Sequence, residues 1–136
     1  MQQEEKAEQR IARLREAVGS LMAKESQCAA ICGKLGRQIP GKATQVKGLE
    51  EACQRHIRIL RGVDYLVPGA PAGQLPLRPR QETLTGLLRT GYLQCIKGAR
   101  EYRRWMDDEE YGPCFQILAE EKQRQSLAFL EILGSL

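Results

Sequence analysis

The sequence lacks the features that mark membrane, secreted and nucleic-acid-binding proteins. No segment approaches the roughly 20 consecutive apolar residues of a membrane span, and the first residues, MQQEEKAEQR, are already charged. The net charge of +4 is modest and the arginines are spread among glutamates, so no basic face for nucleic acid is indicated. The five cysteines are odd in number and form no CxxC pair, which argues against a secreted disulfide framework. We therefore expect a cytoplasmic protein with reduced thiols that binds neither membranes nor nucleic acid.

Aromatic residues are also scarce, at 5% of the chain, whereas the helix-forming residues Ala, Leu, Glu, Arg and Gln are abundant. The chain has 136 residues, which suffices to bury one core without disulfides or metal. The sequence contains no Gly-rich phosphate loop and no recognisable Ser/His/Asp or Cys/His/Asn set. These features predict a single all-α domain without a standard catalytic motif.

Apolar residues recur at helical spacing in four segments, which are separated by glycine- and proline-containing connections. The predicted helices cover residues 2–35, 42–63, 83–106 and 111–133. The connection after the second helix, YLVPGAPAGQLPLRPRQ, contains four prolines and cannot stay helical for long. Short, long and short connections among four helices predict an antiparallel four-helix bundle with one long crossover between helices 2 and 3, as in ferritin-like bundles.

The two predicted helix pairs share an internal pattern. Glu25 precedes Cys53 by 28 residues, and Cys95 precedes Lys122 by 27, so equivalent positions recur in the two halves. All four lie on the faces that the helices turn toward the core. A charged residue there is unusual, because burying an unpaired charge costs several kcal/mol.

Three segments carry a family resemblance: EEACQRHIRILRG, CIKGAREYRRWMDDEEYGPCFQILAEE and LAEEKQRQSLAFLEILG. Their pattern resembles the Glu-x-x-His and Glu-(x)6-Tyr rows of rubrerythrin-type proteins of the ferritin-like superfamily. The resemblance implies one ferritin-like domain over residues 1–136, with helix pairs 2–64 and 82–134 and a crossover at 65–81. It also implies a place in the bundle core where a glutamate from each of two helices and Glu-x-x-His from the other two would bind two irons.

The resemblance assigns six ligand positions to this chain, and only two keep a metal-binding glutamate or histidine. The six positions are Glu25, Cys53, His56, Cys95, Lys122 and Gln125. Glu120 and Glu121 precede Lys122 by one or two residues and turn away from it around the helix, so we expect solvent-facing or capping residues rather than substitute ligands. Paired iron needs several carboxylates, so we expect no iron and no di-iron oxidase or peroxidase chemistry.

Lys122 can be interpreted in two ways. Its ammonium could occupy the place of the metal charge and pair with Glu25 across the bundle, or its four-carbon stem could carry the charge to the surface. His56 is the only histidine, and its simplest role is that of a hydrogen-bonded core residue. An alternative is a rebuilt metal site of Glu25, Cys53, His56 and Cys95, whose soft donors suit zinc or copper(I).

The sequence thus supports three functional hypotheses. The first is a non-catalytic structural or interaction protein, which acts through its surface, has no cofactor and pairs as a homodimer or with an unknown protein. The second is a zinc- or copper-binding protein that uses the cysteine and histidine set. The third is a residual redox enzyme that uses thiols, among them Cys114 at the start of the fourth helix.

Overall fold

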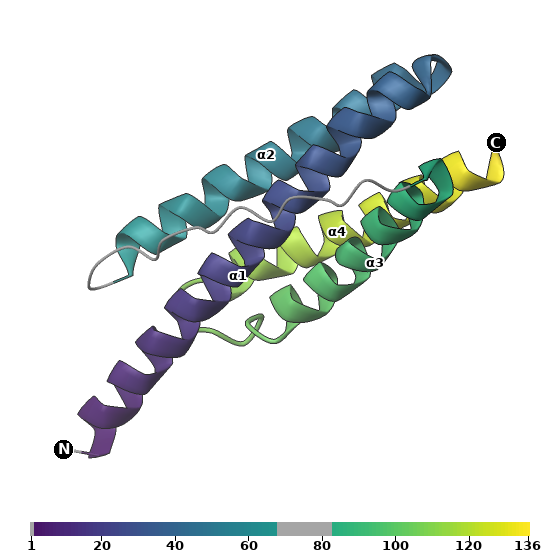
Figure 1. The fold of residues 1–136 in the computed structure, drawn as a ribbon. Coiled ribbons are helices and arrows are strands. Elements are labelled where there is room, and N and C mark those ends of the chain that lie inside the picture. The colour runs from purple at the N-terminus through teal and green to yellow at the C-terminus, as the bar shows by residue number, and fades with distance from the viewer. Residues whose placement is uncertain (1, 68–82) are drawn as a thin grey trace.

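The computed structural model describes residues 2–67 and 83–136, and this part of the chain forms four long helices (Figure 1). They are α1 Gln2–Gln38, α2 Ala43–Leu66, α3 Leu84–Arg103 and α4 Gly112–Gly134, with a short 3-10 helix, η1, at Pro40–Lys42. The predicted all-α class and the four helices are confirmed. Residues 68–82, and with them most of the predicted crossover, lie outside the described residues. None of the described helices has both the length and the apolar character needed to cross a membrane.

Helix ends follow the local sequence. α1 continues past Gly36, where the sequence predicted a break, and reaches Gln38. It stops there because the next residue, Ile39, precedes Pro40, and a residue before proline disfavours helical backbone angles. α3 begins after Thr83, whose hydroxyl oxygen accepts a hydrogen bond of 3.1 Å from the Gly86 backbone N–H. This is the N-cap that threonine commonly forms.

α3 ends earlier than residue 106, the end that the sequence predicted. The α-helix stops at Arg103, and the chain continues in tighter turns. The Trp105 N–H donates to the Tyr102 carbonyl at 3.1 Å, and the Met106 N–H donates to the Arg103 carbonyl at 3.3 Å. These turns place the only tryptophan of the chain beside the end of α3 rather than on its regular surface.

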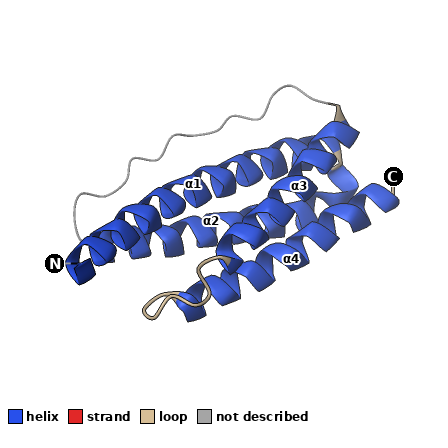
Figure 2. Ribbon diagram, turned by 90° about the horizontal axis from the view of Figure 1, so that it is seen from below, coloured by secondary structure: helices blue, strands red, loops and turns tan. Residues whose placement is uncertain are grey.

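The helices pack as two antiparallel pairs, α1 with α2 and α3 with α4 (Figures 1 and 2). The pairs are joined through contacts between α1 and α3. α3 and α4 approach closely at Gly91, where an added Cβ would lie 2.7 Å from Phe129 Cε1. The missing side chain therefore lets a large aromatic ring of α4 lie against the backbone of α3.

The core contains two apolar clusters with buried polar residues between them. One cluster includes Cys28, Leu35 and Phe129, and the other includes Met22 and Phe115. Met22 and Cys28 are both on α1, and the buried carboxylate of Glu25 lies between them along that helix. The buried polar residues thus lie in the middle of the bundle, between the two apolar clusters. This is where the sequence predicted the remnant of a metal site.

Candidate functional site

The centre of the bundle holds a buried carboxylate, which is contacted by one side chain from each of the other three helices. Glu25 of α1 is 1% exposed. Its Oε1 accepts a hydrogen bond from Lys122 Nζ at 2.6 Å, and its Oε2 accepts one from the Tyr102 hydroxyl at 2.7 Å. The same Oε2 lies 2.9 Å from His56 Nδ1. We call these four residues, Glu25, His56, Tyr102 and Lys122, the Glu25 layer.

Of the two interpretations of Lys122, the structure shows the first: the side chain points into the bundle and pairs with Glu25. The lysine side chain is 3% exposed, so its stem does not carry the charge to the surface. The lysine stem runs past Gly98 of α3, where an added Cβ would lie at an ordinary contact distance of 3.5 Å from Lys122 Cε. The ammonium and the carboxylate form a charge-assisted hydrogen bond, which is stronger than a neutral one. Lys122 therefore compensates the negative charge of Glu25.

The charged groups of the Glu25 layer shift the pKa of one another. Burial raises the pKa of Glu25, but the Lys122 ammonium and the His56 hydrogen bond outweigh burial, and the pKa falls below its usual value. Burial lowers the pKa of Lys122, but negative charge at Cys28 and Glu25 raises it well above its usual value. Burial and the Glu25 charge raise the pKa of Tyr102, so its hydroxyl keeps the proton that it donates. The layer therefore favours a carboxylate facing an ammonium.

Glu121 extends the Glu25 layer toward the surface, which corrects a prediction. The sequence predicted that Glu120 and Glu121 face solvent. Glu120 is exposed, but Glu121 is a quarter exposed and its Oε2 contacts His56 Nε2. The same oxygen accepts a hydrogen bond of 3.0 Å from Arg55, the residue that precedes His56 in α2. The prediction failed because Glu121 borders the face that α4 turns toward α2, where a long side chain still reaches the histidine.

His56 lies between two carboxylates. Its Nδ1 faces Glu25 and its Nε2 faces Glu121, so both ring nitrogens have an acceptor. A neutral imidazole donates from one nitrogen only, whereas the protonated ring donates from both. His56 therefore links the two carboxylates, and basic and acidic side chains alternate from Arg55 at the surface to Lys122 in the core.

Four buried cysteines lie beside the Glu25 layer, and we call them the thiol cluster. They are Cys28, Cys32, Cys53 and Cys95, each 0% exposed and all in one core cluster. Hydrogen bonds from the other three thiols, with the nearby Lys122 charge, lower the pKa of Cys28 well below its usual value despite burial. Hydrogen bonding to Cys28 and burial raise the pKa of Cys95. The neighbouring thiols and the Lys122 charge thus stabilise the deprotonated form of Cys28.

Gln125 connects two of these thiols, and it points inward as the ligand pattern predicted. Its Nε2 lies 3.7 Å from Cys53 Sγ and 3.5 Å from the Leu49 carbonyl oxygen, and its Oε1 lies 3.9 Å from Cys95 Sγ. Lys122 Nζ lies 4.0 Å from Cys53 Sγ. The inward side chains of Lys122 and Gln125 on α4 thus fill the space between the Glu25 layer and the thiol cluster.

The four predicted metal ligands fall into two neighbouring sets. Glu25 and His56 contact each other, whereas Cys53 and Cys95 belong to the thiol cluster. Within residues 2–67 and 83–136, no three His, Cys, Asp or Glu side chains are grouped as ligands of one metal ion. A dinuclear iron centre does not fit these residues, because it needs several carboxylates and would meet the Lys122 ammonium. The zinc or copper role of the four residues stays a prediction.

Sequence reasoning did not predict the hydrogen bond from Tyr102 to Glu25 or the contact of Glu121 with His56. The tyrosine of the Glu-(x)6-Tyr row was a signal that the Tyr102 hydroxyl faces the centre. Sequence reasoning also missed the contact of Glu121 with Arg55, for which spacing along the chain gave no signal, since the two residues lie on different helices.

Comparisons with known proteins give no family assignment. No protein-family model, no curated protein and no solved structure matches this chain significantly. The structure itself defines the class as an all-α four-helix bundle with a buried ion-pair network at its centre.

Proposed function

We propose that this chain is a ferritin-like bundle protein, related to the rubrerythrin group, which has lost its dinuclear metal centre and has a non-catalytic structural or interaction role. The observation that carries the proposal is the Lys122 ammonium, 2.6 Å from Glu25 in the middle of the bundle. Each of the four helices brings one side chain to this level, which is how ferritin-like proteins assemble their metal ligands. In this chain an ammonium takes the place of a metal cation.

The second candidate is a zinc- or copper-binding protein. One observation favours it: Cys53 and Cys95, from different helices, both contact Gln125, so their sulfurs are brought to one region. Thiolates are good ligands for both metals. Lys122 argues against it, because its charge lies 4.0 Å from the Cys53 sulfur. A residual thiol-based redox enzyme is the third candidate, but Cys28 has no exposed surface through which a substrate could reach it.

Metal content separates the first two candidates. The protein is purified anaerobically with reductant, without chelator or histidine tag, and analysed by mass spectrometry for metals before and after incubation with zinc, copper(I) and iron(II). The non-catalytic proposal expects no stoichiometric metal. Stoichiometric zinc or copper that is lost in Cys53→Ser but retained in Cys114→Ser would support the second candidate. Stoichiometric iron in the unaltered protein would contradict both.

A ligand-restored variant tests the ferritin-like relationship directly. The substitutions Cys53→Glu, Cys95→Glu, Lys122→Glu and Gln125→His complete the six-ligand set around Glu25 and His56. We expect this variant, if circular dichroism shows it folded, to bind iron(II) that the unaltered protein does not bind. Lys122→Met is the matched control, since it removes the ammonium without adding a ligand. A folded restored variant that binds no more iron than this control would contradict the relationship.

The proposed interaction role needs a surface, and α4 offers one. Leu127 and Leu130 of α4 are 62% and 42% exposed, and Leu93 of α3 is 40% exposed. Exposed apolar side chains that share a helix face are common in protein interfaces. We propose a homodimer that pairs through these helices. Sedimentation equilibrium should detect a dimer that Leu127→Glu weakens, whereas Arg58→Gln, at an exposed position of α2, should leave it unchanged. A monomer at all concentrations would contradict the homodimer.

A further inference from the structure

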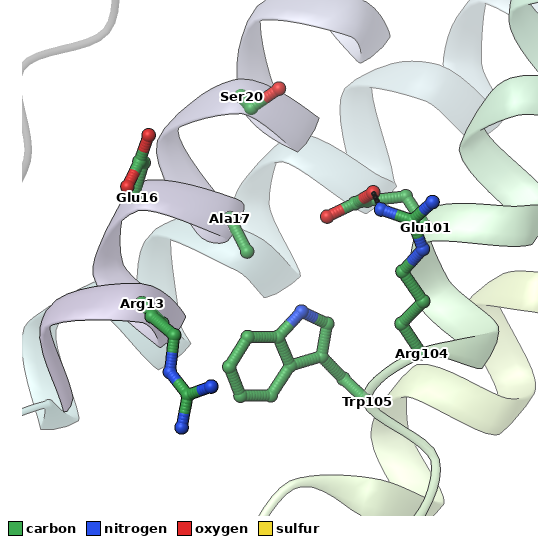
Figure 3. A pocket seen from close by; sticks show the side chains of 7 residues that line it. All are labelled: Arg13, Glu16, Ala17, Ser20, Glu101, Arg104 and Trp105. Carbon is green, nitrogen blue, oxygen red and sulfur yellow. Dashed lines mark hydrogen bonds and ion pairs between the residues drawn. The ribbon is translucent and has the colours of Figure 1, made fainter. Parts of the chain in front are cut away.

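A cavity of about 580 Å³ opens between the first half of α1 and the end of α3 (Figure 3). Small-molecule sites usually have volumes of a few hundred to about 1,000 Å³. The lining residues come from α1 and from the α3 end with its following turn: Arg13, Glu16, Ala17, Ser20, Glu101, Arg104 and Trp105. No residue of the Glu25 layer lines this cavity, so it is a separate feature from the proposed remnant of a metal centre.

Trp105 gives the cavity a flat aromatic wall. The ring is half-buried and packs against Phe115, with the ring centroids 6.4 Å apart. Figure 3 shows the indole lying between Arg13 on one side and the Glu101–Arg104 pair on the other, with the Ala17 methyl beside it. Its ring N–H has no hydrogen-bond partner among the residues that the structure describes. The tryptophan thus offers both a stacking surface and an unused donor.

Arg13 supplies the positive charge that remains free in the cavity. Arg104 donates to Glu101 Oε2 at 3.2 Å, so these two charges largely compensate each other. Arg13 forms no ion pair with any residue in the described part of the chain, and its guanidinium lies next to the indole (Figure 3). A guanidinium binds a carboxylate through two parallel N–H donors. Arg13 and Trp105 together are suited to a ligand that carries both a carboxylate and an aromatic ring.

We infer that this cavity binds a small planar aromatic molecule with a single carboxylate. The ligand ring stacks on Trp105, and its carboxylate accepts hydrogen bonds from Arg13, with the indole N–H as a further donor. Glu16 and Glu101 place two negative charges at the same cavity. Ligands with several negative charges, such as nucleoside triphosphates, are therefore disfavoured relative to a ligand with one.

The single tryptophan makes binding directly measurable. Proton–nitrogen NMR of the labelled full-length protein contains one indole N–H signal, which belongs to Trp105. We expect benzoate to move this signal in a saturable manner. Benzamide, which is neutral, and cyclohexanecarboxylate, which is not aromatic, test the charge and the ring separately. Each should bind about tenfold more weakly than benzoate, because each lacks one of the two recognised features.

Two variants test the residues. Arg13→Gln should weaken benzoate binding about tenfold through loss of the charge-assisted contact, whereas Arg58→Gln, an exposed arginine of α2, should leave it unchanged. Circular dichroism confirms that both variants fold. The inference is overturned by the absence of a saturable shift up to high millimolar benzoate, by equal binding of benzamide, or by equal binding in the two arginine variants. None of these outcomes bears on the lost metal centre, which is tested by metal analysis.

Discussion

Glu25 illustrates at the scale of single residues how a buried carboxylate is stabilised without metal. Its two oxygens contact an ammonium, a phenol hydroxyl and an imidazole, each from a different helix. Burying an ion pair is costly, and removing one partner is costlier than removing both, because the other charge is left unpaired. The contribution of each contact can therefore be measured by substituting one donor at a time.

Lys122→Met should destabilise the protein by about 3 kcal/mol, because Glu25 then remains as a buried charge without its cation. The measurement is the free energy of unfolding in urea near neutral pH. Lys97→Met is the matched control, since Lys97 is an exposed lysine on α3 and its replacement should change the stability little. Equal stability of the two variants would show that Lys122 and Glu25 are not energetically coupled.

Acid should affect the unaltered protein and Lys122→Met differently. In the unaltered protein the pKa of Glu25 lies below its usual 4.5. The ionised carboxylate therefore adds to the free energy of unfolding above pH 4.5, and this stabilisation is lost as the pH falls through the lowered pKa. In Lys122→Met, burial without the ammonium should raise the pKa of Glu25. As the pH falls, Glu25 becomes protonated and the cost of burying its unpaired charge disappears. The stability difference between the two proteins should therefore shrink from about pH 7 to about pH 4. A constant difference would contradict this account.

Tyr102→Phe should cost about 1 kcal/mol, because it removes one hydrogen bond to Glu25 and keeps the ring that packs against Phe115. Urea unfolding measures the loss. Tyr92→Phe is the control, since Tyr92 is half-buried on the same helix and its hydroxyl has no partner among the described residues. A larger effect at Tyr92 than at Tyr102 would contradict the assigned role.

The sequence predicted the inner positions of Glu25 and Lys122 but left their pairing open. Helical spacing and the internal repeat were enough to place both residues on facing inner rows, but a lysine stem can also carry its charge to the surface. The contact of Glu121 with His56 depends on how two helices are rotated against each other, which periodicity along one helix does not determine. The ligand pattern placed Cys53 and Cys95 in one region of the core, and both belong to the thiol cluster.

At the scale of helices, two glycines test how tightly the elements pack. Gly91→Ala should destabilise the protein by roughly 1 to 3 kcal/mol, since the new methyl group would lie 2.7 Å from the Phe129 ring. Gly48→Ala should instead stabilise it by about 0.5 to 1 kcal/mol, because this position in α2 has no atom within 4 Å of an added Cβ and alanine favours helix. Thermal and urea unfolding of both variants provide the comparison. A stabilising Gly91→Ala would mean that α3 and α4 are less closely packed than described.

The helix boundaries show what local sequence determines. The N-cap at Thr83 and the stop before Pro40 follow from the chemistry of single residues. The early end of α3 does not, because residues 104–106 continue in tighter turns although none of them is a helix breaker. That change of backbone brings Trp105 to the cavity beside α1, which is a tertiary effect.

At the scale of the whole molecule, thiol accessibility reports whether the bundle is closed. Cys114 is half-buried, whereas the four members of the thiol cluster are fully buried. Titration with an aromatic disulfide reagent should therefore modify one thiol per chain rapidly in the native state and the other four only after denaturant is added. Cys114→Ser should abolish the rapid phase. Rapid modification of additional thiols in that variant would indicate that the bundle opens readily.

The four-helix convergence on Glu25 limits which charges the core can accept. A glutamate at position 122 would leave two carboxylates in the core without an ammonium between them. A glutamate at position 53 or 95 would add a further negative charge beside a lysine that is already paired. Each of these single substitutions would therefore give a less stable protein. Selection for folding alone would then keep the lysine in place.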